Sequence, residues 1–307
     1  MSKPFLTYEE QIELLKSKGI KIIKNKSTVE ILQRENYYRV INGYKDLFID
    51  KNSSEEQFIE GTKFSEIYAL YNFDRSLRNL FLEKILKIEN SIKSVIAYEF
   101  SKNYGHKDYL LKSNFDEKNR KEEDINGVIE FINDAVNKQK QHEAISHYLK
   151  KHNFIPMWVL VNILTLGTVS NFYSIMKQKD RIAISKIFNI LEVELEKYLK
   201  LLTYYRNKAA HEERMYKTKT KHIIRNNKIH LKMNIEKDSS GNYKYGRGDI
   251  FALLIVCKML LKKDEVTSLV RGIDKIVKEL DKKLITVPTD KVLELMGFPK
   301  NWKEINL

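Results

Sequence analysis

Apolar side chains recur every three or four positions from residue 63 to about residue 104. This spacing matches a helix of 3.6 residues per turn that buries one of its faces. We therefore expect one long amphipathic helix, or two helices in line. The repeating apolar positions are Ile67, Leu70, Phe73, Leu77, Leu80, Phe81, Ile85, Ile88, Ile92, Val95 and Ile96.

The rest of the chain also favours helices, because only eleven glycines and four prolines occur in 307 residues. Sheet proteins need many tight turns, which these two residue types build. We expect a mainly α fold, a multi-helix bundle of two closely packed lobes or one large domain. A highly charged stretch, residues 112–125, places the lobe boundary between residues 1–115 and residues 116–307.

Three further segments carry specific predictions. Residues 191–205 lack glycine and proline and predict a helix, and the apolar residues 156–167 predict a short helix in the core. Residues 221–235 alternate polar and apolar side chains about Asn226 and Asn227, which predicts a small β-hairpin. This hairpin would lie in a basic insertion, about residues 217–248.

The net charge of +14 and the isoelectric point near 9.4 indicate a polyanionic partner. Lysine and arginine gain free energy when they displace the counterions condensed on phosphates. The N-terminus lacks the apolar segment of a signal peptide, and no apolar run reaches the roughly 18 residues that would span a bilayer. We expect a cytoplasmic protein that does not enter a membrane.

A cluster of chemically useful side chains lies in residues 206–211, with the sequence Arg-Asn-Lys-Ala-Ala-His. Arg206 can hold a phosphate with a permanently charged, forked guanidinium, and His211 can transfer a proton near neutral pH. Asn207 lies four residues before His211, so on a helix its amide could orient the imidazole. Together these groups could cleave RNA without a metal or another cofactor.

On an undistorted helix Arg206 and His211 would point about 140° apart. Two arrangements would resolve this: the helix breaks before His211, or the site is composite. A two-fold homodimer would supply a second histidine, so that one imidazole acts as base and the other as acid.

A structural role for the cluster remains open. Cations near the C-terminus of a helix interact favourably with its dipole, and the same spacing recurs from Arg225 to His230 within the predicted hairpin. Arg75 and Arg78 could likewise form ion pairs on a solvated helix face or bind RNA. The histidines lack zinc-ligand spacing, and no phosphate-binding loop is present, so we expect no metal site.

Residues 206–211, followed by Arg214 and Tyr216, resemble the Arg-Asn-x-x-Ala-His signature of HEPN ribonucleases (higher eukaryotes and prokaryotes nucleotide-binding domains). Other segments resemble the Abi family of bacterial abortive-infection, phage-resistance proteins. These are residues 37–44, 71–78, 88–92, 156–158, 166–167 and 296–302.

The resemblance implies an all-helical HEPN-like core and a metal-independent endoribonuclease with a toxin-like role, in which Arg206 and His211 are catalytic and Asn207 supports them. It also implies a restraining partner, either a small non-coding RNA or an antitoxin. We expect further RNA contacts from Arg39, Arg75, Arg78, Arg214 and Tyr216. The alternatives are a non-catalytic RNA-binding or antitoxin-type protein, and a transferase of nucleotidyl or phosphate groups.

Overall fold

The long periodic segment forms a single helix, α3 (Phe64–Tyr104), in the computed structural model, which describes residues 4–23 and 25–306. A helix of 41 residues extends for about 60 Å. At its start the Glu66 carboxylate accepts the Lys63 amide at 3.1 Å, and at its end Gly105 adopts a φ of +81°. The sequence predicted one long helix or two helices in line, and the structure has the single helix.

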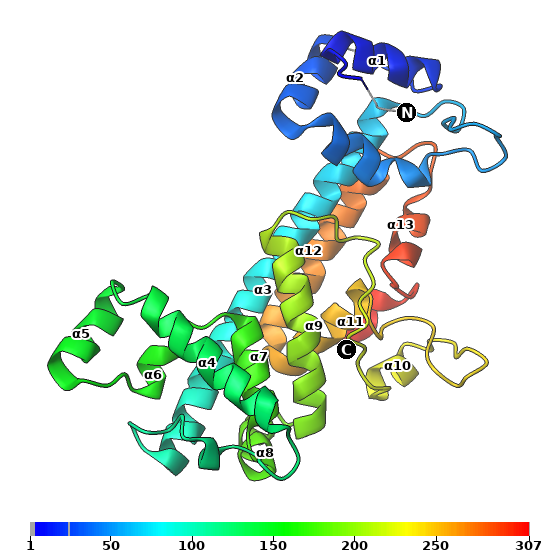
Figure 1. Ribbon diagram of the computed structural model, residues 1–307. Helices are drawn as coiled ribbons and strands as arrows, with labels where there is room; N and C mark the ends of the chain where they lie inside the picture. The colour runs from blue at the N-terminus through cyan, green and yellow to red at the C-terminus, as the bar shows by residue number, and fades with distance from the viewer. Residues whose placement is uncertain (1–3, 24, 307) are drawn as a thin grey trace.

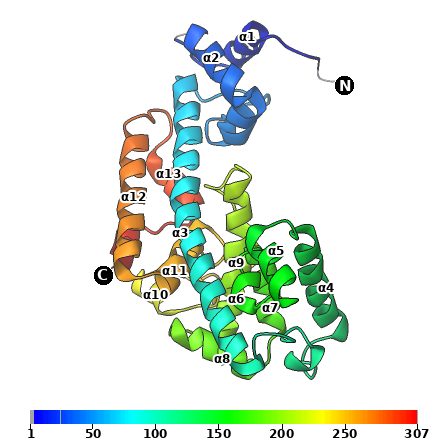
Figure 2. The same cartoon turned by 90° about the vertical axis from the view of Figure 1, so that its left-hand side faces the viewer.

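Helix α3 is the axis of the molecule, and helices from the second half of the chain pack along it (Figure 1). Helix α12 (Lys263–Asp281) and helix α9 (Glu192–Ala210) run beside α3, and in Figure 2 they lie on either side of it. Helix α11 (Ile250–Leu260) packs against all three and is buried over most of its length. These helices place the end of α9 against the middle of α3.

Smaller elements surround the two ends of α3 (Figure 1). The first end carries α1 (Tyr8–Ser17), α2 (Asn25–Glu35), the π-helical turn η1 (Tyr38–Asn42) and the 3-10 turn η2 (Lys45–Leu47). The other end carries η3 (Lys112–Asn114), α4 (Glu122–Lys138), α5 (Glu143–His152), α6 (Met157–Leu160), α7 (Leu166–Ile175) and α8 (Gln178–Ile187). The remaining elements are α10 (Lys228–Lys232), α13 (Thr289–Leu295) and η4 (Trp302–Asn306).

The predicted β-hairpin in residues 221–235 is wrong. These residues instead contain helix α10, and the described part of the chain has isolated β-bridges but no β-strand. Asn227, which we expected in the turn, caps α10: its side chain accepts the Ile229 amide at 2.9 Å. Asparagine suits a turn and a helix N-cap equally well, and here the helical option is realised.

The predicted core helix over residues 156–167 is also wrong. Helix α6 ends at Leu160, and α7 begins separately, with the Thr165 side chain accepting the Thr168 amide at 3.1 Å. Trp158 is half exposed, whereas its neighbours Met157 and Leu160 are buried. The central apolar helix is α11 instead.

The lobe boundary at residues 115 and 116 stays a prediction. Helix α3 lies in the first predicted lobe, and most of its packing partners lie in the second. Over the residues that the structure describes, no helix combines the length and the apolar character needed to cross a bilayer.

Candidate active site

Helix α9 carries Arg206 and Asn207 in its last turn and ends in a defined C-cap. It buries one apolar face and lacks glycine and proline, so the predicted helix over residues 191–205 is confirmed and extends to Ala210. His211 is the cap residue, and Glu212 follows in the left-handed region with a φ of +54°. The Glu212 amide bonds the Ala209 carbonyl at 3.2 Å, and the Glu213 amide bonds the Lys208 carbonyl at 3.0 Å. This pair of bonds is the Schellman arrangement that closes a helix.

His211 is still on the helical path. Its backbone amide bonds the Asn207 carbonyl at 3.0 Å, the i to i−4 pattern of a helix, and the chain departs only at Glu212. The helix therefore does not break before His211, and the angular separation from Arg206 is retained.

The Arg206 side chain points towards α3. Its guanidinium Nε lies 3.8 Å from Oε2 of Glu89, a carboxylate on α3 whose side chain is only 6% exposed. Lys93, one turn further along α3, holds the other oxygen of Glu89 at 2.7 Å. Two cations thus share one buried carboxylate, so the cluster keeps a net positive charge. The Arg206 side chain is 31% exposed, and its guanidinium has donors left for a phosphate, although its Nε is buried.

The imidazole of His211 is presented to solvent. His211 and Asn207 are both exposed, and among the described residues no hydrogen bond joins their side chains. A free imidazole at a rigid helix end is able to accept or donate a proton.

A buried carboxylate on α3 anchors the segment that follows His211. Asp74 is fully buried and accepts the backbone amides of Met215 at 3.0 Å and Tyr216 at 2.7 Å. It also accepts the Tyr44 hydroxyl at 2.6 Å and the Arg78 guanidinium at 2.7 Å. Burial raises the pKa of Asp74, whereas these four donors act in the opposite direction. All four partners of Asp74 are hydrogen-bond donors, and donors favour the ionised carboxylate over the protonated acid.

The same segment is held to the N-terminal region at the surface. Arg39 pairs with Glu212 at 2.9 Å, and both side chains are more than half exposed. Arg214 donates to the Gly43 carbonyl and lies 3.6 Å from the Asp46 carboxylate. These contacts hold the α9 C-cap from a second direction.

Two of the predicted RNA-binding residues are buried. Arg78 and Tyr216 are buried in the Asp74 cluster, and Tyr216 stacks on the Tyr44 ring. The Arg75 guanidinium donates two hydrogen bonds to the Glu35 carboxylate, and this interaction lowers the pKa of Glu35. RNA contact by these side chains, and by Arg39 and Arg214, stays a prediction.

The second Arg-Asn-x-x-x-His sequence has a different environment. His230 is buried; its Nδ1 accepts the Asn227 amide at 3.2 Å, and its Nε2 donates to the Gly246 carbonyl at 2.7 Å. Burial lowers the pKa of His230. Its imidazole is a neutral structural group, whereas that of His211 is free.

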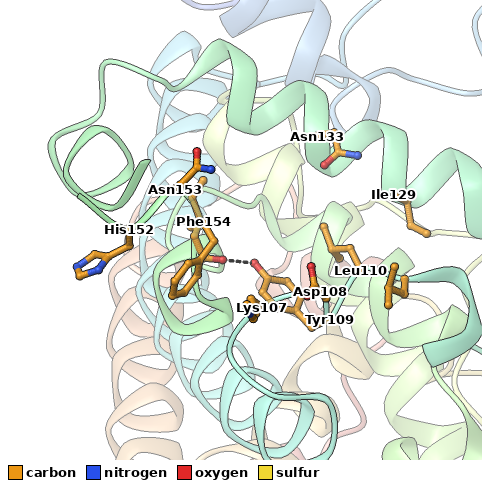
Figure 3. Close-up of a pocket in the computed structure, with 11 residues that line it drawn as sticks. Lys107, Asp108, Tyr109, Leu110, Ile129, Asn133, His152, Asn153 and Phe154 are labelled. Carbon is orange, nitrogen blue, oxygen red and sulfur yellow. Dashed lines mark hydrogen bonds between the residues drawn. The ribbon is translucent and has the colours of Figure 1, made fainter. Parts of the chain in front are cut away.

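A cavity of about 550 Å³ lies away from these residues, between the segment before α4 and the end of α5 (Figure 3). The Tyr109 hydroxyl donates to the Ile155 carbonyl at 2.6 Å in its wall, and the His152 ring points away from it. It contains no paired acid and base for catalysis. Within residues 4–23 and 25–306, no cluster of three or more His, Cys, Asp or Glu side chains is arranged to hold a metal.

Sequence reasoning missed Asp74 and Glu89 as parts of this site. Asp74 falls between Leu70 and Leu77 on the stripe of apolar positions, and Arg78 follows it at the i+4 position. Opposite charges at Asp74 and Arg78, on a helix face that is otherwise apolar, indicate a buried ion pair with a structural role. Glu89 carries the same signal, because Lys93 follows it at the i+4 position, but its partner Arg206 is far away in the sequence and could not be predicted.

Comparison with known proteins identifies a family. The family model described as Abi-like protein matches residues 30–217, which is more than half of the chain and includes Arg206 and His211. No curated protein and no solved structure matches the chain.

Proposed function

The chain belongs to the Abi-like protein family, and we propose that it is a metal-independent endoribonuclease whose catalytic residues are Arg206 and His211. Membership in this family suggests a role in abortive infection, the bacterial defence that gives resistance to phage. RNA cleavage in an infected cell would halt the growth on which the phage depends. The HEPN-like sequence from Arg206 to His211 supports the assignment as an endoribonuclease.

One observation carries the proposal: a partly exposed arginine and a free histidine lie within one rigid helix end. Arg206 is oriented by the buried Glu89, and the turn after His211 is fixed by Asp74. Preorganised charge and a proton-transfer group are the two requirements of a metal-free phosphodiester cleavage.

The reaction then follows from these groups. His211 takes the proton from a ribose 2′-hydroxyl, and the resulting oxygen attacks the adjacent phosphorus. Arg206 neutralises the negative charge that builds on the phosphoryl oxygens. The bond from phosphorus to the 5′-oxygen breaks, and an imidazolium returns a proton to that oxygen. The products are a 2′,3′-cyclic phosphate and a 5′-hydroxyl end.

Arg206 and His211 still point in directions about 140° apart around the helix axis. This separation supports a composite site in a homodimer. A second copy of the chain would bring its own His211 beside the first arginine, and the two imidazoles would then act as base and acid. The net charge of +14 also suits a restraining RNA or an acidic protein partner.

The decisive experiment compares His211→Ala and Arg206→Ala with the wild type on single-stranded RNA. We expect each variant to lose cleavage by at least about 100-fold while circular dichroism is unchanged. Arg225→Ala is the matched control, since Arg225 is exposed and opens the second copy of the same spacing.

Wild-type cleavage should persist in EDTA, and the products should carry cyclic phosphate. Full cleavage by His211→Ala would disprove the assignment. Salt-dependent binding with no cleavage by any form would instead identify a non-catalytic RNA-binding protein.

A further inference from the structure

A groove of about 800 Å³ runs along α3 beside α6. Figure 2 shows these two helices next to each other. Its α3 residues recur every three or four positions, so they form one face of the helix. The lining residues are Asn90, Lys93, Ser94, Ala97, Tyr98, Ser101 and Lys102 from α3, with Trp158 from α6 and Val161 and Asn162 after it. From residue 90 to residue 102 the face extends about 18 Å.

Two large aromatic side chains of the groove are exposed. Tyr98 is 67% and Trp158 is 50% accessible to solvent. The Asn162 amide donates to the Trp158 carbonyl at 2.9 Å, which fixes the short helix that carries the indole. Rigid exposed aromatic faces are the usual platforms on which unpaired bases stack.

The polar lining of the groove suits a phosphate backbone. It includes Lys93 and Lys102 but no carboxylate, although Lys102 lies 3.7 Å from Glu99 on the same helix. The Ser101 hydroxyl is buried and has no hydrogen-bond partner among the described residues. Lys102 is 61% exposed, whereas Lys93 is 12% exposed and is paired with Glu89, so Lys102 is the more accessible cation beside the aromatic rings.

One end of the groove meets the candidate active site. Lys93 lines the groove and binds Glu89, and the other oxygen of Glu89 faces Arg206 at 3.8 Å. A strand that lies along this face would pass Lys93, whose partner Glu89 faces Arg206.

We propose that this groove binds about three to five nucleotides of single-stranded RNA. Bases stack on Tyr98 and Trp158, and Lys93 and Lys102 contact the backbone of the strand that leads to Arg206. The inference rests on the proposed function, because it names the substrate path of the same site. A duplex would keep its bases paired and would not present them to these rings.

The occupant could otherwise be a second copy of the chain, since exposed aromatics also occur at protein interfaces. The local charge of the groove decides between them. Its lining includes lysines and no carboxylate, so a two-fold contact through this face would set the lysines of one copy against those of the other, whereas a phosphate strand is attracted. We therefore assign the groove to RNA.

The test measures binding separately from cleavage. All proteins carry His211→Ala, and the probe is a fluorescein-labelled single-stranded RNA of twelve uridines, followed by anisotropy. Tyr98→Ala and Trp158→Ala should each weaken binding by roughly 5- to 50-fold. Lys102→Ala should lower the slope of log affinity against log salt by about 0.7.

Exposed side chains elsewhere supply matched controls. Phe131→Ala on α4 and Lys278→Ala on α12 remove a similarly exposed ring and a similarly exposed charge, and should leave binding unchanged. Tryptophan fluorescence gives a second readout, because Trp158 is half exposed and the other tryptophan, Trp302, is buried. Bound RNA should quench Trp158, and the quenching should vanish in Trp158→Ala.

The outcomes separate this inference from the proposed nuclease. Cleavage is measured on Tyr98→Ala and Trp158→Ala in proteins that retain His211. If both variants bind RNA like the His211→Ala parent and cleave it like the wild type, the groove assignment is wrong and the nuclease stands. If the wild type does not cleave RNA but both variants lose binding, the groove assignment stands and the nuclease is wrong. If either variant changes the sedimentation coefficient and leaves RNA binding intact, the groove is a dimer interface and our inference is overturned.

Discussion

The buried carboxylate of Asp74 accepts the backbone amide of Tyr216 at 2.7 Å, which joins the long helix α3 to the turn that follows the candidate catalytic histidine. The two residues are 142 positions apart in the chain. Four donors converge on this carboxylate, so one side chain on α3 sets the position of the segment after α9.

We expect Asp74→Asn to destabilise the protein by about 3–5 kcal/mol, because the buried Arg78 guanidinium would lose its counter-charge. Urea denaturation followed by circular dichroism measures the change. The double variant Asp74→Asn, Arg78→Met should recover part of the loss, since it leaves no unpaired buried charge. A loss below about 1 kcal/mol in the single variant would show that Asp74 is not the anchor we describe.

The two histidines that share one sequence spacing should behave in opposite ways. His230→Ala should cost about 2–4 kcal/mol of stability, because it leaves a cavity and two unpaired backbone groups. His211→Ala should cost little stability, because His211 is exposed, and should abolish cleavage. Thermal melts and RNA cleavage assays, run on both variants, should therefore rank them in reverse order.

The pH dependence of the protein's stability provides a further check on the role of His230. Burial lowers the pKa of His230 below its ordinary value of 6.5. Its contribution to stability is therefore present above pH 6.5 and is lost as pH falls through the lowered pKa. Denaturation of the wild type between pH 7.5 and pH 5 should show this loss, and His230→Ala should show less of it.

The Glu66 carboxylate ties the start of α3 to the loop after α12. Burial raises the pKa of Glu66, but hydrogen bonds from Thr286, Ile285 and Lys63 outweigh it, so the net pKa is below 4.5. Its contribution to stability should be present above pH 4.5 and decline as pH falls through the lowered pKa. Glu66→Gln should cost about 1–3 kcal/mol at pH 7 and flatten the acid limb of the stability curve. An acid limb identical to that of the wild type would contradict this role.

Glu89 should act by positioning Arg206. We expect Glu89→Gln to lower kcat for RNA cleavage by about 10- to 100-fold with a small change in KM, because the guanidinium would lose its fixed orientation. Glu83→Gln is the control, since Glu83 lies on the same helix and its side chain is exposed. A change confined to KM would mean that Glu89 affects RNA binding and not the orientation of Arg206.

A composite site can be tested by mixing wild-type and His211→Ala subunits in equal amounts. If both imidazoles of a dimer are needed, as base and as acid, only dimers of two wild-type subunits should cleave RNA. After subunit exchange these are about a quarter of all dimers, so activity should be about a quarter of that of the same total amount of wild type. Activity of about one half would mean that each copy works alone and would argue against the composite site.

Local periodicity predicted much of the helical frame. Residues 63–104 and 191–205 repeat apolar side chains at helical spacing, and both form helices. The prediction failed where a local pattern has two solutions. Asn227 caps a short helix in place of a hairpin turn, and Trp158 is the half-exposed residue of a helix that ends at Leu160 in place of a longer core helix. Turn residues and short apolar runs do not by themselves specify which neighbours they meet.

The sequence by itself determined the helical class, the basic charge and the sequence position of Arg206 and His211, since these depend on residue type and on spacing along the chain. Only the tertiary structure decided that Glu89 faces Arg206, that Asp74 anchors the turn after His211, and that His230 is buried while His211 is free. The physical reason is that burial and ion pairing depend on tertiary contacts, such as that between Asp74 and Tyr216, 142 positions apart, which helical periodicity does not encode.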